Sequence, residues 1–145
     1  MKVIEAIKEH GINWLNAELG ITVKEYPEEE LYVLNYSQID SPKQGDIVKE
    51  CRGLIIDNDL NVVSRSFDRF FNLGECETTF NPKNSIIFEK IDGSLIKIYY
   101  WDNEWHVSTR GTAFAESEVN GWDITFGDIV LRTLGYNDYQ FQQQC

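Results

Sequence analysis

Apolar positions follow two different periodicities along the first third of the chain. Over residues 2–19 they recur at helical spacing with a break at Gly11, which predicts two short helices that cover one face of a sheet. Over 21–26 and 31–36 apolar and polar residues alternate, as they do in strands whose two faces differ in burial. Pro27 and the three glutamates after it separate these strands and predict a solvated turn.

The rest of the chain predicts further short strands and then helices. The segment 41–45 is predicted to be a loop, and 53–57 and 61–65 are predicted to form a hairpin. More strands are predicted at 86–89, 95–101 and 105–110, and helices at 113–120 and 123–134, the last of them ended by Gly135. Many strands joined by tight turns, with helices gathered at the two ends, indicate an α+β fold with antiparallel sheet.

Composition indicates one globular domain with an acidic balance. The chain has 145 residues, 42% of them hydrophobic and 13% aromatic, which is enough for a single core. The formal net charge of −11 opposes tight, non-specific binding of nucleic acid, because such binding needs clustered cations. The charge argues less against a nucleotide site, which needs only a few cations in a cleft.

Cysteine usage and hydropathy bear on the compartment. Cys51, Cys76 and Cys145 are odd in number and scattered, so they predict neither a disulfide framework nor a zinc site and fit a reducing cytosol. The sequence shows no signal peptide and no membrane span, and a cytoplasmic location is expected.

Residues 89–95, Glu-Lys-Ile-Asp-Gly-Ser-Leu, carry the most informative chemistry. Lys90 ends the predicted strand that begins at Ile86 and precedes an Asp-Gly turn into the next strand. Gly93 would let a phosphate or sugar approach the backbone, and a partly desolvated lysine can lose its proton and act as a nucleophile. Taken alone, Lys-Ile-Asp-Gly fits an ordinary Asp-Gly hairpin turn better.

Three further motifs accompany this segment. Glu-Cys-Arg-Gly-Leu-Ile lies at 50–55, Phe-Asp-Arg-Phe-Phe-Asn at 67–72, and Ser-Thr-Arg-Gly-Thr at 108–112. In this order and spacing the four motifs resemble the adenylyltransferase domain of ATP-dependent RNA ligases, most closely the bacteriophage tRNA-repair type. The resemblance runs from about residue 31 to 112 and implies an antiparallel-sheet nucleotidyltransferase fold of the ligase and capping-enzyme kind. DNA ligases and GTP-using capping enzymes share Lys-x-Asp-Gly but fit the other motifs poorly.

The resemblance implies a role for each motif residue. Lys90 would attack the α-phosphate of ATP, Arg52 and Arg69 would hold its phosphates, and Arg110 stands where the family usually has a lysine. Asp92 would orient the lysine or the sugar, Glu89 would read the adenine edge, and the aromatic residues would line the pocket. The implied nucleotide-binding residues are Tyr36, Arg52, Arg69, Phe71, Glu89, Asp92, Gly93 and Arg110. Mg²⁺ would accompany ATP, and no protein metal site is implied.

Plainer interpretations of the same residues stay open. Each arginine, taken singly, is explained better by a surface salt bridge to one of the 24 acidic residues. Tyr36 fits an ordinary strand end, and the aromatic pair at 70–71 fits a core.

The family pattern continues beyond the motifs of this chain. Family members have a strand with a ribose-binding glutamate, another acidic motif and a Lys-x-Lys strand, whereas Lys97 is the last lysine here. Residues 1–145 are therefore expected to be the N-terminal portion of a single adenylyltransferase domain, incomplete at the C-terminus: a fragment, half of a split gene, or a decayed remnant. Such a truncated sheet is expected to be marginally stable, to self-associate, and to adenylylate itself at least ~100-fold more slowly than an intact homologue.

Two functional hypotheses from different classes follow. The first is an RNA ligase that forms lysyl-AMP at Lys90 and seals RNA 5′-phosphate and 3′-hydroxyl ends, such as those of nicked tRNA, in the cytoplasm of a bacterial host. A separate C-terminal chain is a candidate partner for it. The second is a non-catalytic module that binds a nucleotide or a partner, which the acidic balance and the absent Lys-x-Lys favour.

Overall fold

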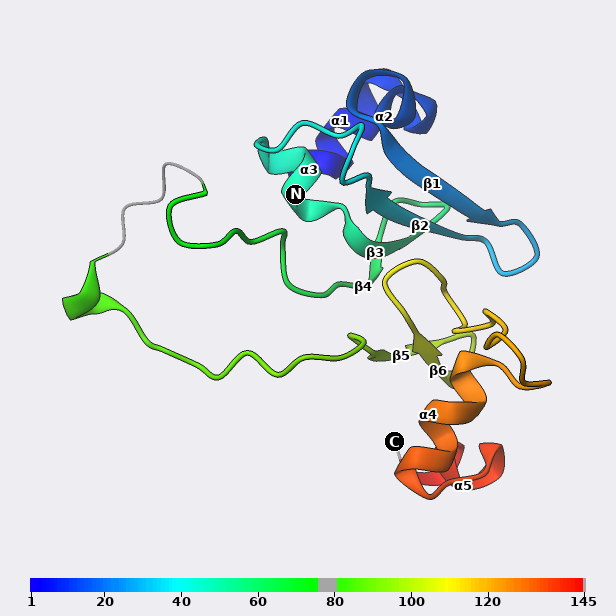
Figure 1. The fold of residues 1–145 in the computed structure, drawn as a ribbon. Coiled ribbons are helices and arrows are strands. Elements are labelled where there is room, and N and C mark those ends of the chain that lie inside the picture. Colours follow the sequence, from blue (N-terminus) through cyan, green and yellow to red (C-terminus); the bar gives the residue numbers. More distant parts are fainter. Residues whose placement is uncertain (76–80, 145) are drawn as a thin grey trace.

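A computed structural model describes residues 1–75 and 81–144 as an α+β protein with two antiparallel sheets (Figure 1). The larger sheet has the strand order β1-β2-β3-β4 and the smaller pairs β5 with β6. The strands are β1 (Ile21–Tyr26), β2 (Leu31–Tyr36), β3 (Arg52–Asp57), β4 (Val62–Ser64), β5 (Lys97–Trp101) and β6 (Glu104–Ser108). The helices are α1 (Lys2–His10), α2 (Ile12–Leu19), α3 (Asp46–Glu50), α4 (Phe126–Leu134) and α5 (Asp138–Gln144), with a 3₁₀ turn, η1 (Pro82–Asn84). The predicted α+β class is confirmed.

One face of the larger sheet is covered by α1 and α2, as the helical spacing of residues 2–19 predicts. Val3, Ile7 and Leu15 pack in one buried cluster with Leu34 of β2 and Leu54 of β3. Successive side chains of a strand point to opposite faces, so Leu34 of β2 faces the helices while Val33 faces the other side of the sheet. Both predicted strand ranges, 21–26 and 31–36, are confirmed.

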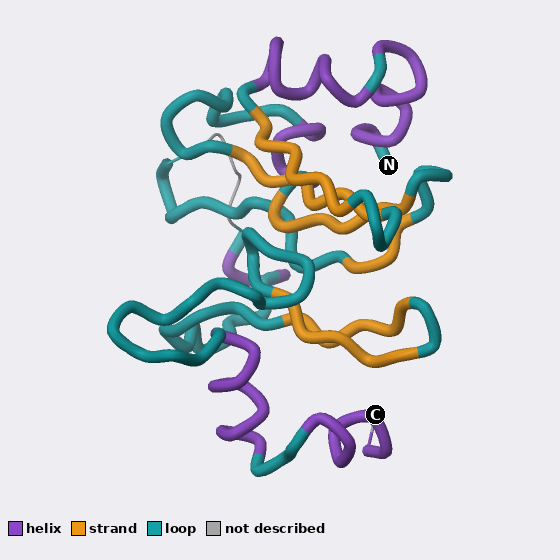
Figure 2. Tube along the Cα trace, turned by 90° about the vertical axis from the view of Figure 1, so that its right-hand side faces the viewer, coloured by secondary structure: helices purple, strands orange, loops and turns teal. Residues whose placement is uncertain are grey.

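The opposite face of the larger sheet receives the β5–β6 hairpin. Val33 and Ile55 are buried there with Tyr99 of β5 and Ala113, which follows β6. Figure 2 shows the resulting layers: helices at the top, the larger sheet, the hairpin, and α4 and α5 at the bottom. No helix in the described part of the chain is both long and apolar enough to cross a bilayer.

The last helix also covers the edge of β6. The Gln142 side chain accepts a hydrogen bond from the Trp105 backbone N–H (2.7 Å) and donates one to the Trp105 carbonyl (2.8 Å). A side-chain amide thus substitutes for a neighbouring peptide at a strand edge that would otherwise present unpaired polar groups.

The predicted strand at 86–89 is wrong. Residues 85–96 run as an extended segment that leaves both sheets (Figure 1, light green), and none of them pairs with a strand among the described residues. Ile86, Ile87 and Phe88 are 79–87% exposed. An apolar run becomes a strand only where a neighbouring strand satisfies its backbone, and no described segment does so here.

The predicted helix at 113–120 is also wrong. Ala113 instead takes an irregular conformation in which its N–H donates to the Tyr26 hydroxyl (3.0 Å) and its carbonyl accepts from the Tyr99 hydroxyl (3.0 Å). These tertiary bonds replace the ones that a helix would supply. The segment then forms an isolated bridge between Glu118 and Thr125.

Several predicted boundaries shift for local reasons. The helix predicted at 123–134 begins at Phe126, because Thr125 and Asp128 form a capping box, and it ends at Gly135 as predicted. The strands predicted at 95–101 and 105–110 are shorter than expected, and the hairpin predicted at 53–57 and 61–65 corresponds to β3 and β4. The short elements α3, α5 and η1 were not expected.

Candidate functional site

Four cationic side chains gather where the larger sheet meets the turn after β6, and none of them pairs with a carboxylate of a described residue. They are Arg52, Arg69, Lys97 and Arg110, and we call them the cation cluster. The ion pairs among the described residues lie elsewhere: His10–Glu9, Lys24–Glu116, Arg65–Asp68 and Lys90–Asp92. Other lysines and arginines of this acidic chain also lack an ion pair among the described residues, so the grouping of these four is what favours an external anion as their partner.

Tyr36, at the end of β2, holds two of these arginines. The guanidinium carbons of Arg69 and Arg110 each lie 4.3 Å from the centroid of its ring, and the residue is only 9% exposed. Arg110 also donates from Nε to Asn35 Oδ1 (2.9 Å) and from Nη2 to the Tyr36 carbonyl (3.1 Å). Cation–π contact and hydrogen bonds therefore fix both side chains in place without neutralising their charge.

Arg69 connects this pair to a shallow pocket. Its backbone N–H donates to the Lys49 carbonyl (2.8 Å), and its guanidinium carbon lies 5.2 Å from the Phe71 ring centroid. The pocket has a volume of about 270 Å³. It is lined by Tyr36, Gln38, Lys43, Arg69, Phe70, Phe71 and Glu75. That volume is slightly below the roughly 300 Å³ lower bound of small-molecule sites, so the pocket fits part of a nucleotide.

Gly53 allows the backbone next to Arg52 to approach the backbone of Arg110. Its φ is +68°, and a Cβ atom there would lie 2.7 Å from the Arg110 carbonyl oxygen. Only glycine fits both the left-handed conformation and the backbone approach. Arg52, next to it, has its guanidinium carbon 4.9 Å from the Phe70 ring centroid, and its Nη1 is buried without a partner among the described residues. A buried charged donor without an acceptor is costly, which again favours an anion here.

Lys97 is the member of the cluster that the sequence analysis did not assign to the site. Its side chain crosses from β5 and donates to the Gly53 carbonyl, and the residue is only 8% exposed. Burial lowers the pKa of the Lys97 ammonium to about 8, so it remains mostly charged at neutral pH. Its alternation with buried Tyr99 along the strand was the available signal, since a lysine at an inward position is rarely incidental.

The remaining predicted site residues lie apart from the cluster. Lys90 sits in the exposed segment, its side chain 72% exposed and its Nζ 2.8 Å from Asp92 Oδ1, and this hydrogen bond lowers the pKa of the Asp92 carboxyl. Glu89 and Gly93 are exposed as well. The structure thus brings Tyr36, Arg52, Arg69, Phe71 and Arg110 together and leaves Lys90, Glu89, Asp92 and Gly93 outside. The expectation that Lys90 ends a buried strand is wrong.

Larger pockets occur around α4, at about 430 and 560 Å³, but they contain Arg132 as their sole lysine or arginine. They therefore lack the grouped cations of the cluster. Among the described residues, no three His, Cys, Asp or Glu side chains are grouped closely enough to hold a metal ion.

Comparison with known proteins identifies a family. A family model described as RNA ligase matches residues 50–139, which include Arg52, Arg69, Lys90 and Arg110. A putative bifunctional polynucleotide kinase/RNA ligase of Autographa californica nuclear polyhedrosis virus is 43% identical over 149 residues, covering 93% of this chain and 21% of the viral protein. An RNA ligase of Rhodothermus phage RM378 is 29% identical over 118 residues, covering 62% of this chain and 27% of the phage protein.

The chain thus spans only 21% and 27% of the lengths of these two relatives. No solved structure matches it significantly. The family match covers more than half of the chain and contains all four clustered cations. This chain belongs to the phage-type RNA ligase family.

Proposed function

We propose that this chain supplies the nucleotide-binding and lysine-adenylylating part of an ATP-dependent RNA ligase, with a nucleotidyltransferase-type fold. The observation that supports this most is the cation cluster: four positive side chains grouped around Tyr36 and Gly53, without described carboxylate partners, in an acidic protein. Planar guanidinium groups suit phosphate oxygens, and their charge survives partial burial. The triphosphate of ATP is the anion that the family assignment favours.

The proposed role of each residue follows from its position. Arg52, Arg69 and Arg110 would bind phosphate oxygens, while Phe71 and the ring of Tyr36 would border the base or ribose in the adjoining pocket. Mg²⁺ would enter with the nucleotide phosphates, whose negative charge it would neutralise.

Lys90 would be the nucleophile. Its neutral Nζ would attack the α-phosphorus, forming an N–P bond and breaking the P–O bond to pyrophosphate, which leaves. Transfer of the adenylyl group to an RNA 5′-phosphate would free Lys90, and attack by an RNA 3′-hydroxyl would seal the ends with release of AMP. RNA ends, including those of nicked tRNA, and a separate C-terminal chain are the proposed partners.

Attack requires the Lys90 segment to approach the cation cluster. The hydrophobic effect favours this movement, because four apolar side chains of the segment are more than three-quarters exposed: Ile86, Ile87, Phe88 and Ile91. Burying one such side chain is worth roughly 1.5–3 kcal/mol. Packing this segment against the body of the protein would remove that apolar surface from water and bring Lys90 with it. Glu89, Asp92 and Gly93 would arrive together with the nucleophile.

Labelled ATP tests the chemistry. The chain is incubated with ATP labelled at the α-phosphate and Mg²⁺, alone and with the remainder of a longer relative supplied as a second chain, and covalent label is measured. Label is expected on wild type and on Lys83→Ala, an exposed lysine of the same part of the chain, and absent from Lys90→Ala. Label that persists in Lys90→Ala would exclude this nucleophile.

A non-catalytic nucleotide-binding module is the second candidate. The exposure of the Lys90 side chain, which bonds to Asp92, favours it, since binding needs the cluster alone. Calorimetric ATP binding without any covalent label, even with the second chain supplied, would select this function over the ligase.

A further inference from the structure

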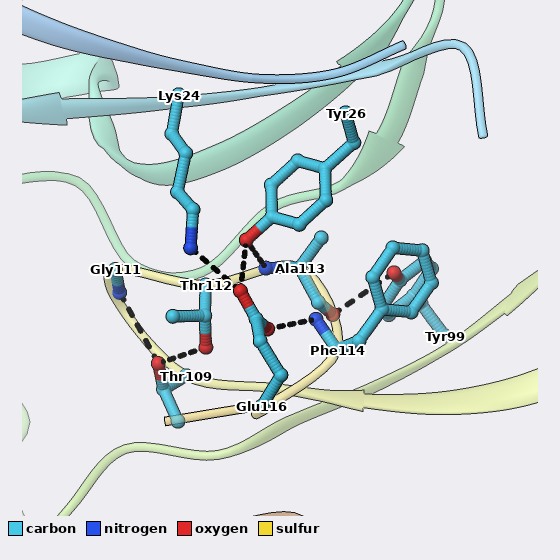
Figure 3. Close-up of polar contacts among 9 residues, drawn as sticks. All are labelled: Lys24, Tyr26, Tyr99, Thr109, Gly111, Thr112, Ala113, Phe114 and Glu116. Carbon is cyan, nitrogen blue, oxygen red and sulfur yellow. Dashed lines mark hydrogen bonds and ion pairs between the residues drawn. The ribbon is translucent and has the colours of Figure 1, made fainter. Parts of the chain in front are cut away.

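The turn that carries Arg110 is closed on itself. The Thr109 backbone N–H donates to the Thr112 carbonyl (3.2 Å), the two threonine hydroxyls share a hydrogen bond of 2.8 Å, and the Gly111 N–H donates to Thr109 Oγ1 (3.3 Å). Figure 3 shows the bond between the two hydroxyls and the bond from Gly111 to Thr109. Arg110 therefore sits at the corner of a small rigid unit, and the direction of its side chain depends on how that unit is attached to the larger sheet.

The attachment beyond the turn is made by β1. The Lys24 ammonium and the Tyr26 hydroxyl both donate to Glu116 Oε1, each at 2.6 Å, while the Phe114 N–H donates to Glu116 Oε2 (3.2 Å) (Figure 3). The Tyr26 hydroxyl in turn accepts from the Ala113 N–H (3.0 Å). We call Lys24, Tyr26 and Glu116 the latch.

The carboxylate is the centre of the latch. By accepting a hydrogen bond from Tyr26, Glu116 orients the hydroxyl so that its oxygen is available to the Ala113 N–H. Burial and the hydrogen bond to Glu116 raise the pKa of Tyr26, so the phenol stays a donor at neutral pH. Burial opposes ionisation of Glu116, but the hydrogen bonds from Lys24 and Tyr26 outweigh it and lower its pKa, so the acceptor stays charged.

The solvent exposure of the latch indicates a role in positioning rather than in folding stability. The side chains of Lys24 and Glu116 are 44% and 40% exposed, and ion pairs screened by water to this degree contribute little to folding stability. The latch nevertheless fixes the residues between Ala113 and Glu116, which follow directly on the Arg110 turn. Its effect should therefore be visible in the position of Arg110 more than in the unfolding curve.

We propose that Glu116 is a positioning residue that sets the Arg110 guanidinium against Tyr36 by tying the turn after β6 to β1. The ATP readout of this inference rests on the proposed function, because it assumes that Arg110 binds the triphosphate. The geometric part does not, since Arg110 contacts Asn35 and Tyr36 in the protein alone.

A double-mutant cycle tests the ATP readout. Glu116→Ala is expected to weaken ATP binding about fivefold, the usual size of one lost hydrogen-bonded constraint. In an Arg110→Met background the same substitution is expected to have no further effect, because it acts through Arg110. Glu118→Ala, an exposed glutamate two residues along, is the matched control and should leave binding unchanged. Equal, additive losses in both backgrounds would overturn the proposal.

A second readout does not depend on ATP. Phenylglyoxal modification of Arg110, quantified by peptide mapping, is expected to be several times faster in Glu116→Ala than in wild type, with Arg65 and Arg132 unchanged as internal controls. Faster modification in a protein that does not bind ATP would keep the positioning role and refute the proposed function. Unchanged modification of Arg110 in a folded Glu116→Ala protein would refute the positioning role whatever ATP does.

Discussion

Replacing Gly53 by alanine perturbs the closest backbone approach in the candidate site. Gly53 has a φ of +68°, and its missing Cβ would lie 2.7 Å from the carbonyl oxygen and 3.0 Å from the Cα of Arg110. Both atoms belong to backbone that is held by the closed Thr109–Thr112 turn, so they cannot move aside as a flexible side chain would.

The expected cost has two parts. A non-glycine residue in the left-handed region loses about 1–2 kcal/mol. Forcing an extra methyl into a packed contact typically costs about 1–3 kcal/mol more. Gly53→Ala should therefore destabilise the protein by about 2–5 kcal/mol, a large share of the ~5–15 kcal/mol that holds an ordinary domain folded.

Urea unfolding followed by tryptophan fluorescence measures this cost, provided that the slope of the transition stays constant between variants. The matched control is Gly111→Ala, because a Cβ at Gly111 meets no atom within 4 Å, and it should stay within about 0.5 kcal/mol of wild type. If Gly53→Ala is as stable as Gly111→Ala, the reasoning about the backbone contact is refuted.

Three other predictions concern the cluster and the exposed segment. Burial holds the Lys97 pKa near 8, well below the usual 10.5, so between these pH values the folded state binds fewer protons than the unfolded state. The free energy of unfolding of wild type should therefore rise by about 1.4 kcal/mol per pH unit above pH 8, relative to that of Lys97→Met. A constant difference between the two unfolding free energies from pH 7 to 9.5 would contradict this. Tyr36→Phe keeps the ring that the arginines contact and should change calorimetric ATP affinity less than about twofold, whereas Tyr36→Leu should weaken it about fivefold or more; equal effects would refute the cation–π role. Ile87→Asp should keep the free energy of unfolding of the isolated chain within about 0.5 kcal/mol of wild type, because the side chain is exposed. It should abolish labelling of Lys90, because Ile87 would be buried when the Lys90 segment packs against the body of the protein; full labelling would show that Ile87 is not buried in that step.

The sequence predicted those parts of the fold in which local pattern and tertiary environment agree. Strands β1 and β2 carry apolar residues that pack against α1 and α2, and the end of α4 at Gly135 follows from a left-handed C-cap. The apolar run at 86–89 does not form a strand because a strand also needs a neighbouring strand, which hydropathy does not report. The segment 113–120 does not form a helix because the hydroxyls of Tyr26 and Tyr99, both remote in sequence, take the hydrogen bonds of Ala113.

The candidate site divides in a similar way. Arg52, Arg69 and Arg110 could be selected by resemblance, and the structure brings them together through Gly53 and Tyr36. Their grouping depends on a glycine whose backbone touches a turn 57 positions later, and no local pattern encodes that contact. Lys97 was missed because its role arises from burial across two sheets.

The most direct test of the account is calorimetric titration of ATP into wild type and into arginine variants. Arg69→Met and Arg110→Met each remove a clustered charge but keep an unbranched side chain, and each should weaken ATP binding about tenfold, as expected for a lost charge-assisted hydrogen bond to phosphate. Arg132→Met, outside the cluster, should bind like wild type. Equal affinity in all four proteins, or no ATP binding by wild type, would contradict the claim that the cation cluster is a triphosphate site.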